Sequence, residues 1–209
     1  MAGSREMIFI INADSNMRQS LTHLCETTLC PVTACASAAE FLADFQPAQP
    51  CCLIMDLGAP DMPGVEFLRE VRRRQWRLPV IFTAAQVDVS TAVSAMRLGA
   101  VDICLQPVEP TVLVSLVRRT LALAAQQERN FHRIAGARRL LASLSPRELQ
   151  LFALVLDCKS NKEMGAHLGI SPRTVEQHRA HITRKLGVDR VADMVRLGLL
   201  ASHETIPSA

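Results

Sequence analysis

Short apolar runs alternate with amphipathic segments over the first 126 residues of the chain. Continuous stretches of apolar and β-branched residues, typical of strands buried on both faces of a parallel sheet, occupy residues 7–11, 31–36, 51–55, 79–82 and 102–105. After each run, apolar residues recur at helical spacing, in segments 17–29, 38–45, 65–74, 90–98 and 111–126. Five β/α units in this order predict an α/β fold with a five-stranded, doubly wound parallel sheet. Its functional site is expected at the carboxyl ends of the strands.

The second part of the chain shows helical patterns alone. Ser145 and Glu148, three residues apart, form a capping box at the start of an apolar helix. A shorter helix is predicted over 161–168 and another over 172–186, each ended by a glycine. A last helix begins after Asp189. This segment therefore predicts a small all-α domain behind the α/β domain.

An extended helix is predicted between the two parts. Residues 124–142 form a continuous helical pattern, and we expect the helix to break at Gly136 because glycine disfavours a helix interior. The chain is thus predicted to consist of an N-terminal domain over 1–123, a helical linker over 124–141 and a C-terminal domain over 142–209.

The predicted helix over 172–186 has two chemically different faces. At about 100° per residue, Val175, Ile182 and Leu186 fall on one side, which suits packing on a small core. The opposite side is basic and amide-rich and consists of Glu176, Gln177, Ala180, His181 and Arg184. A helix divided in this way can rest on its domain with one face and enter the major groove of DNA with the other.

Several short motifs accompany these helices, namely Asn161-Lys162-Glu163, Thr174-Val175, His178, Ile182 and Lys185-Leu186-Gly187. Together with the order of the helices they resemble the LuxR-type DNA-binding domain over residues 142–201. The resemblance implies a helix-turn-helix that contacts base edges with Glu176, Gln177, Ala180 and His181. Phosphate contacts are expected from Asn161, Lys162, Arg173, Thr174, Arg184 and Lys185. An ordinary helical domain is the alternative, but it does not explain the basic outward face.

A second set of motifs follows the strands of the N-terminal domain. Residues 53–64 combine a buried strand with Asp56 and the loop after it, residues 79–83 end in Thr83, and Gln106-Pro107 follows the last strand. Over residues 7–122 this arrangement resembles the receiver domain of response regulators. The resemblance implies a phosphoacceptor at Asp56 and a switch hydroxyl at Thr83. The two halves together resemble a response regulator of the NarL/FixJ class.

Three charged groups that receiver chemistry uses are missing from this sequence. Receivers hold Mg²⁺ with two acidic residues after the first strand and contact the phosphoryl group with a lysine. Here Asn12 and Ala13 replace the acidic pair, and Gln106 replaces the lysine. Asp14 aligns with a position that is not normally a ligand. No other lysine can substitute, because the chain contains only Lys159, Lys162 and Lys185.

A pocket that keeps one carboxylate and loses two others and an ammonium holds Mg²⁺ weakly. We therefore expect slow or absent phosphorylation of Asp56 and no resident cofactor, with Mg²⁺ involved only if Asp56 is phosphorylated. Asp56 is then a relic, or Gln106 and Asn12 hold the pocket in one state through neutral hydrogen bonds. The alternative is a conventional receiver that a cognate sensor histidine kinase phosphorylates, with Asp14 turned in as a metal ligand.

Charge is divided unequally between the two halves. Residues 1–124 carry 10 Lys and Arg against 12 Asp and Glu, a net charge of −2, whereas residues 125–209 carry 13 against 8, a net charge of +5. This division favours double-stranded DNA bound by the C-terminal half alone.

One small domain covers little DNA, so a homodimer on two half-sites is expected. The sequence does not decide which surface forms the dimer interface. The last helix offers one apolar stripe and the helix over 111–126 another, and packing within a single chain explains both nearly as well. These stripes are Val191, Met194, Val195 and Leu199, and Leu113, Leu116 and Val117.

Cysteine usage and the apolar runs favour a cytoplasmic protein. Seven cysteines without metal-ligand spacing are expected to be reduced core thiols, with a redox switch through Cys25, Cys30 or Cys35 as the minor alternative. The N-terminus lacks the features of a signal peptide, and no membrane-spanning segment is expected. The sequence predicts a DNA-binding transcription regulator that is not an enzyme. An adaptor that binds a kinase or regulator without phosphotransfer is the alternative from another class, and a small-ligand sensor is a third.

Overall fold

The computed structural model describes residues 6–47 and 49–202 and divides into two compact units that meet between Glu128 and Arg129. The first unit is the α/β domain, and the second is built of helices, as the sequence predicts. The predicted domains also include residues 1–5 and 203–209, which lie outside the described residues.

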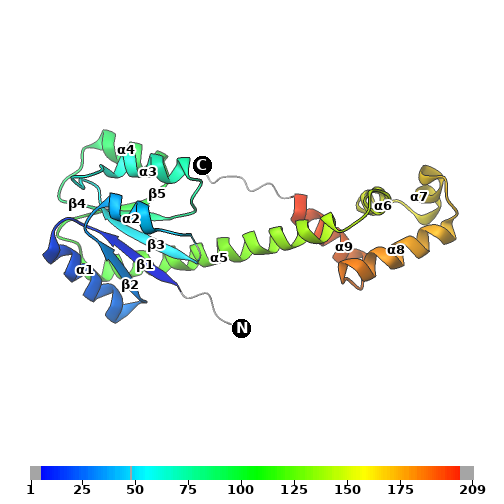
Figure 1. The fold of residues 1–209 in the computed structure, drawn as a ribbon, viewed down its shortest axis with the longest axis horizontal. Coiled ribbons are helices and arrows are strands. Elements are labelled where there is room, and N and C mark those ends of the chain that lie inside the picture. The colour runs from blue at the N-terminus through cyan, green and yellow to red at the C-terminus, as the bar shows by residue number, and fades with distance from the viewer. Residues whose placement is uncertain (1–5, 48, 203–209) are drawn as a thin grey trace. The chain divides into compact units, whose positions relative to one another are not determined.

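The first unit contains a parallel sheet with the strand order β2-β1-β3-β4-β5 (Figure 1). The strands are β1 (Met7–Ile11), β2 (Val32–Cys35), β3 (Cys51–Asp56), β4 (Val80–Ala84) and β5 (Ala100–Leu105). The predicted fold and the five strands are confirmed, and β5 begins two residues earlier than expected. Because the order changes direction between β1 and β3, the doubly wound topology opens a site at the carboxyl ends of these two strands.

Helices cover both faces of this sheet, and the side chains of each strand alternate between them. The helices α1 (Ser15–Thr28) and α5 (Pro110–Ala142) cover one face, where they enclose an apolar cluster with Ile8, Ile10, Cys52, Ile54 and Ile81. The helices α2 (Ala38–Asp44), α3 (Gly64–Arg73) and α4 (Val89–Arg97) cover the other, above Ile11, Leu53, Met55, Val80 and Phe82. None of the described helices combines the length and the apolar character that a membrane crossing needs.

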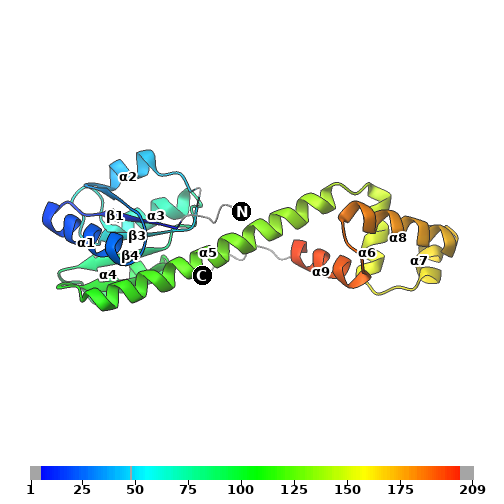
Figure 2. The same ribbon diagram turned by 90° about the horizontal axis from the view of Figure 1, so that it is seen from below.

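The second unit contains the end of α5 and the helices α6 to α9 (Figure 2). These helices are α6 (Pro146–Leu156), α7 (Asn161–Leu168), α8 (Pro172–Leu186) and α9 (Val191–Ser202). The predicted capping box of Ser145 and Glu148 is formed, and Gly169 and Gly187 end α7 and α8 in the left-handed conformation. The core contains Leu151, Phe152, Met164, Val175, Ile182, Leu186 and Met194.

The predicted break at Gly136 is wrong, because α5 continues without interruption from Pro110 to Ala142. A glycine in a helix interior costs about 1 kcal/mol relative to alanine, and a single one does not outweigh helix formers on both sides. The glycine has no steric role either, since a Cβ built at this position meets nothing within 4 Å.

We predict that Gly136→Ala stabilises the second unit by about 0.5–1 kcal/mol, because the substitution removes backbone freedom from the unfolded chain and introduces no clash. The measurement is chemical unfolding followed by circular dichroism at 222 nm. Trp76, the single tryptophan, lies in the first unit and serves as an internal control by fluorescence. Destabilisation by Gly136→Ala would contradict the continuous helix. Gly165→Ala is the matched control that should destabilise the unit, since its Cβ would lie 2.7 Å from the Ile170 carbonyl oxygen and clash with it.

Candidate functional site

Polar side chains gather where the strand order of the sheet changes direction. Asp56 is the last residue of β3 and pairs in register with Thr83 of β4. Asn12 directly follows β1, whose last residue Ile11 pairs with Met55. Asn12 and Asp56 therefore occupy neighbouring strand ends. The structure thus brings together the predicted phosphoacceptor, the switch hydroxyl and the residue that stands in place of the first acidic ligand.

The hydroxyl of Thr83 is buried without a hydrogen-bond partner. The residue is 0% exposed, and its Oγ1 is the one buried side-chain oxygen or nitrogen without a partner in the described part of the chain. Asp56 is half-buried, and its Oδ1 accepts a hydrogen bond of 3.0 Å from the N–H of Gly58. An unpaired buried hydroxyl costs on the order of 1–3 kcal/mol. The arrangement therefore suits a bound or attached group that offers the Thr83 hydroxyl a hydrogen-bond partner.

The side chain of Asn12 is hydrogen-bonded to the backbone two residues further along the chain. Its Oδ1 accepts a hydrogen bond of 2.9 Å from the N–H of Asp14, and the residue is 2% exposed. The carboxylate of Asp14 is the N-cap of α1 and accepts from the N–H groups of Asn16 and Met17 at 2.8 and 3.1 Å. A metal ion on Asp14 would compete with this cap, which typically contributes about 1 kcal/mol.

Arg18 is a cation at this strand end that the sequence pattern did not single out. Its Nη1 donates hydrogen bonds to the carbonyl oxygens of Asn12 at 2.6 Å and Ala13 at 3.3 Å. The guanidinium therefore satisfies backbone acceptors where β1 ends. Its spacing of five and six residues from its partners spans a strand-to-helix junction, so no helical or strand periodicity could have revealed it.

Gln106 makes its hydrogen bond at this strand end through its main chain. It follows β5, and its backbone N–H donates to the carbonyl oxygen of Ala84 at 2.8 Å. Among the hydrogen bonds of the described residues, none joins the side chain of Gln106 to Asp56, so the neutral contact that the sequence suggested is not formed.

The residues present do not fit a resident Mg²⁺. The ion prefers octahedral oxygen ligands with carboxylates among them. In residues 6–47 and 49–202, no group of three or more His, Cys, Asp or Glu side chains is placed to hold a metal ion. Asp56 is the carboxylate that remains at the strand ends, while Asp14 is engaged as a cap.

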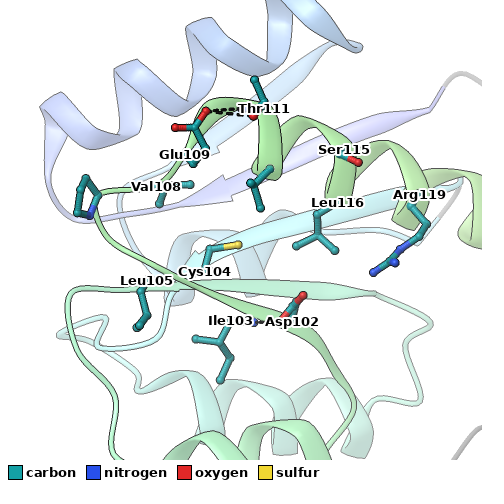
Figure 3. A pocket seen from close by; sticks show the side chains of 12 residues that line it. Asp102, Ile103, Cys104, Leu105, Val108, Glu109, Thr111, Ser115, Leu116 and Arg119 are labelled. Carbon is teal, nitrogen blue, oxygen red and sulfur yellow. Dashed lines mark hydrogen bonds between the residues drawn. The ribbon is translucent and has the colours of Figure 1, made fainter.

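An open pocket of about 620 Å³ lies beside this site between β5 and α5 (Figure 3). Cys104, which pairs in register with Thr83, faces Leu116 across it. At one end Glu109 accepts a hydrogen bond of 3.0 Å from the hydroxyl of Thr111. Since β5 is an edge strand of the described sheet, the pocket lies at the edge of that sheet.

The seven cysteines are free thiols, and burial makes the core thiols poor nucleophiles. Desolvation raises the pKa of Cys25 to about 11 and that of Cys51 to about 12, and it raises the pKa of Cys52 well above its ordinary value. Burial raises the pKa values of Cys30 and Cys35 as well. These shifts favour core thiols over the redox switch.

The α8 helix exposes the side predicted to contact DNA. Val175, Ile182 and Leu186 are buried, as the periodicity predicts. Exposed residues on the other side include Arg173, Glu176, Gln177, Ala180, His181 and Arg184, and Lys162 is exposed on α7. Thr174 is half-buried, and its hydroxyl lies 2.8 Å from that of Ser171, the N-cap of the helix.

Two of the predicted DNA contacts, Lys185 and His181, also face a buried carboxylate. The Nζ of Lys185 donates to Glu148 at 2.9 Å, and Nδ1 of His181 lies 3.3 Å from the same carboxylate. The Ser145 N–H and then Lys185 hold the pKa of Glu148 at about 2, well below its usual range. The capping box revealed Glu148 in the sequence, but its contact with a helix 37 residues away has no local signal.

Comparison with known proteins identifies both units. Residues 8–118 match the family model of the response regulator receiver domain, and residues 142–197 match that of bacterial regulatory proteins of the luxR family. The chain is a response regulator with a LuxR-type DNA-binding domain. This response regulator is 34% identical to transcriptional regulatory protein FixJ of Azorhizobium caulinodans, over 93% of the chain and 92% of the relative. It is 33% identical to response regulator protein TodT of Pseudomonas putida, over 94% and 87%.

Solved structures agree with this assignment. The response regulator StyR superposes with a TM-score of 0.86 at 28% identity, covering 94% of this chain and 99% of that one. Full-length FixJ from B. japonicum gives a TM-score of 0.59 at 30% identity, covering 96% and 98%. The receiver fold and the helical C-terminal domain are therefore those of this family.

We predict that the second unit loses stability as the pH falls from about 5 towards 2, in part through Glu148. A carboxyl whose folded pKa is depressed contributes stability above its unfolded pKa of about 4.3, and this contribution is lost as the pH falls through the folded value. Glu148→Gln should lower stability at pH 7 and show a shallower loss in acid. Urea unfolding followed at 222 nm from pH 7 to pH 3 measures both. Parallel pH profiles for the two proteins would rule out this role of Glu148.

Proposed function

We propose that this response regulator is a DNA-binding transcription regulator whose receiver acts with weak or no phosphorylation. The observation that carries the proposal is the loss of charge around Asp56, where Asn12, Ala13 and Gln106 occupy the positions of two carboxylates and an ammonium. Phosphoryl transfer relies on electrostatic stabilisation of the moving phosphoryl group. A pocket without the metal ligands and the lysine lacks most of that stabilisation.

Conventional phosphorylation at Asp56 by a sensor histidine kinase is the second candidate, and one observation favours it. The buried Thr83 hydroxyl lies in register with Asp56 and has no partner in the described residues. A phosphoryl oxygen on Asp56 would supply an acceptor for this hydroxyl. The adaptor alternative gains no such support, because it does not explain the exposed, basic side of α8.

On DNA we assign the exposed side of α8 to the major groove. Glu176, Gln177, Ala180 and His181 are proposed to face base edges, since Gln pairs with adenine and Glu accepts from the amino group of cytosine. Lys162, Arg173, Thr174, Arg184 and Lys185 are proposed to contact phosphates. No role in this assignment makes the protein an enzyme.

The regulator is proposed to act as a cytoplasmic homodimer on two half-sites. Leu113, Leu116, Val117 and Met194, from the apolar stripes considered in the sequence, are buried in the cores of their own units. Val191 and Leu199 of the α9 stripe are exposed. Further exposed apolar side chains lie at the open edge of the receiver, on α4, β5 and the start of α5, and comprise Val89, Val93, Met96, Leu105 and Val112. This surface is the receiver's candidate for pairing two chains.

We predict that the full chain selects a duplex sequence and binds it with two chains per duplex. Lys162→Ala should reduce the slope of log affinity against log salt by about one unit and leave base preference unchanged. Gln177→Ala should change preference at one base pair by roughly tenfold. Selection from a random duplex library, titration at several salt concentrations and light scattering of the complex provide the readouts. Arg69→Ala, on the exposed surface of the receiver, is the control. Absence of sequence selection would exclude the proposed function.

We predict that a small phosphodonor with Mg²⁺ leaves the mass of the native protein unchanged. The triple variant Asn12→Asp, Ala13→Asp, Gln106→Lys should acquire a phosphoryl adduct on the order of 10²-fold faster, because it regains the metal ligands and the lysine. Intact-mass measurement over time follows the adduct, and Asp56→Ala in both backgrounds shows that Asp56 carries it. Equal, Mg²⁺-dependent rates for the native protein and the triple variant would establish the conventional mechanism instead.

A further inference from the structure

The side chain of Asn161, at the start of α7, is a bridge between two residues of α8. Its Nδ2 donates a hydrogen bond of 3.2 Å to Oε1 of Glu176. Its Oδ1 accepts a hydrogen bond of 2.6 Å from Nη1 of Arg179. The amide therefore connects an anion and a cation that lie three residues apart on the recognition helix.

Only one orientation of the amide satisfies both partners. With the oxygen and nitrogen exchanged, a carbonyl would face the Glu176 carboxylate and an NH₂ group would face the Arg179 guanidinium, which are pairs of acceptors and of donors. Both hydrogen bonds involve an ionised group, and such bonds are shorter and stronger than neutral ones. The bridge therefore fixes the rotamers of all three side chains.

We infer that Asn161 is a positioning residue for base recognition, which holds the Glu176 carboxylate in place to accept from the amino group of cytosine. The inference rests on the proposed function and replaces the role of phosphate anchor that the sequence suggested for Asn161. Glu176 is exposed, and in the described residues its second carboxylate oxygen is without a partner. That oxygen is free to accept from a base edge.

Preorganisation explains why this contact needs a neighbour. A glutamate has three rotatable bonds, and on a bare helix surface its ordering would offset much of the benefit of one hydrogen bond to a base. Asn161 orders the carboxylate before DNA arrives. Arg179 completes the arrangement, because its hydrogen bond holds the amide with the NH₂ group towards Glu176.

The packing of α7 on α8 does not depend on the bridge. Met164 and Val175 are 1% and 0% exposed in the shared core, and at Gly165 the backbone of α7 lies against that of Ile170. Removal of one half-buried amide therefore leaves the helix pair folded. A purely structural amide would, if removed, weaken binding to all sequences alike.

The test uses the full chain. Selection with Glu176→Ala first identifies the base pair at which this variant loses its sequence preference, and the test duplex contains that base pair. Asn161→Ala should reduce the preference for cytosine at that base pair by roughly tenfold, with affinity for unrelated duplex changed less than about twofold. Asn161→Asp should lose the same preference, because it keeps the acceptor for Arg179 but turns a carboxylate towards Glu176. The double variant with Glu176→Ala should match Glu176→Ala alone.

Lys162→Ala is the matched control from the adjacent position, and it should weaken binding to all sequences without a change in preference. Two results would overturn the inference while leaving the proposed function intact. One is a base preference of Asn161→Ala identical to that of the native protein. The other is a loss of affinity by Asn161→Ala that is equal for all sequences. A native protein that selects no duplex sequence would remove both proposals. Melting of each variant at 222 nm shows that the compared proteins are folded.

Discussion

The alternation of side chains along a parallel sheet that is covered on both faces determines where this protein can place polar atoms. Ile54 and Ile81 point towards α1 and α5, and Met55 and Phe82 point towards α2, α3 and α4. Both faces of the sheet are therefore occupied by apolar packing along the strands. In the three central strands β1, β3 and β4, polar side chains occur only near the carboxyl ends. Asn12, Asp56 and Thr83 lie at those ends, and the same geometry that builds the core therefore assembles the pocket.

The same constraint explains why the receiver fold does not require charged side chains at residues 12, 13 and 106. Asn12 forms its hydrogen bond with the backbone N–H of Asp14, Arg18 binds the carbonyl oxygens of residues 12 and 13, and Gln106 contacts Ala84 through its main chain. None of these interactions needs a carboxylate at residues 12 or 13 or a lysine at residue 106. The fold is stabilised by burial and backbone pairing, whereas phosphoryl transfer needs specific charges. The two requirements can therefore separate in one chain.

Local signals in the sequence predicted most of the fold. The apolar runs located the strands, the capping box of Ser145 and Glu148 located the start of α6, and Gly169 and Gly187 located the ends of α7 and α8. The prediction of a break at Gly136 failed because it considered the cost of glycine in a helix interior without the helix-forming residues on either side. The bridge through Asn161 and the contact of Lys185 with Glu148 were beyond reach for another reason. They join residues 15 to 37 positions apart, whose approach depends on the angle between packed helices rather than on any periodicity.

Intramolecular pairing also changes how the positive charge of the second unit bears on DNA. Lys185 is paired with Glu148, and Arg179 is engaged with Asn161, so these cations are partly compensated before DNA is bound. Lys162, Arg173 and Arg184 are exposed and have no partner in the described residues of this unit. Each cation that neutralises a phosphate contributes about 0.9 to the salt slope, so three per unit correspond to a slope of about −5 for two units. In the proposed complex with DNA, non-specific attraction is thereby limited, and discrimination between sequences is assigned to ordered polar groups such as Glu176 rather than to net charge.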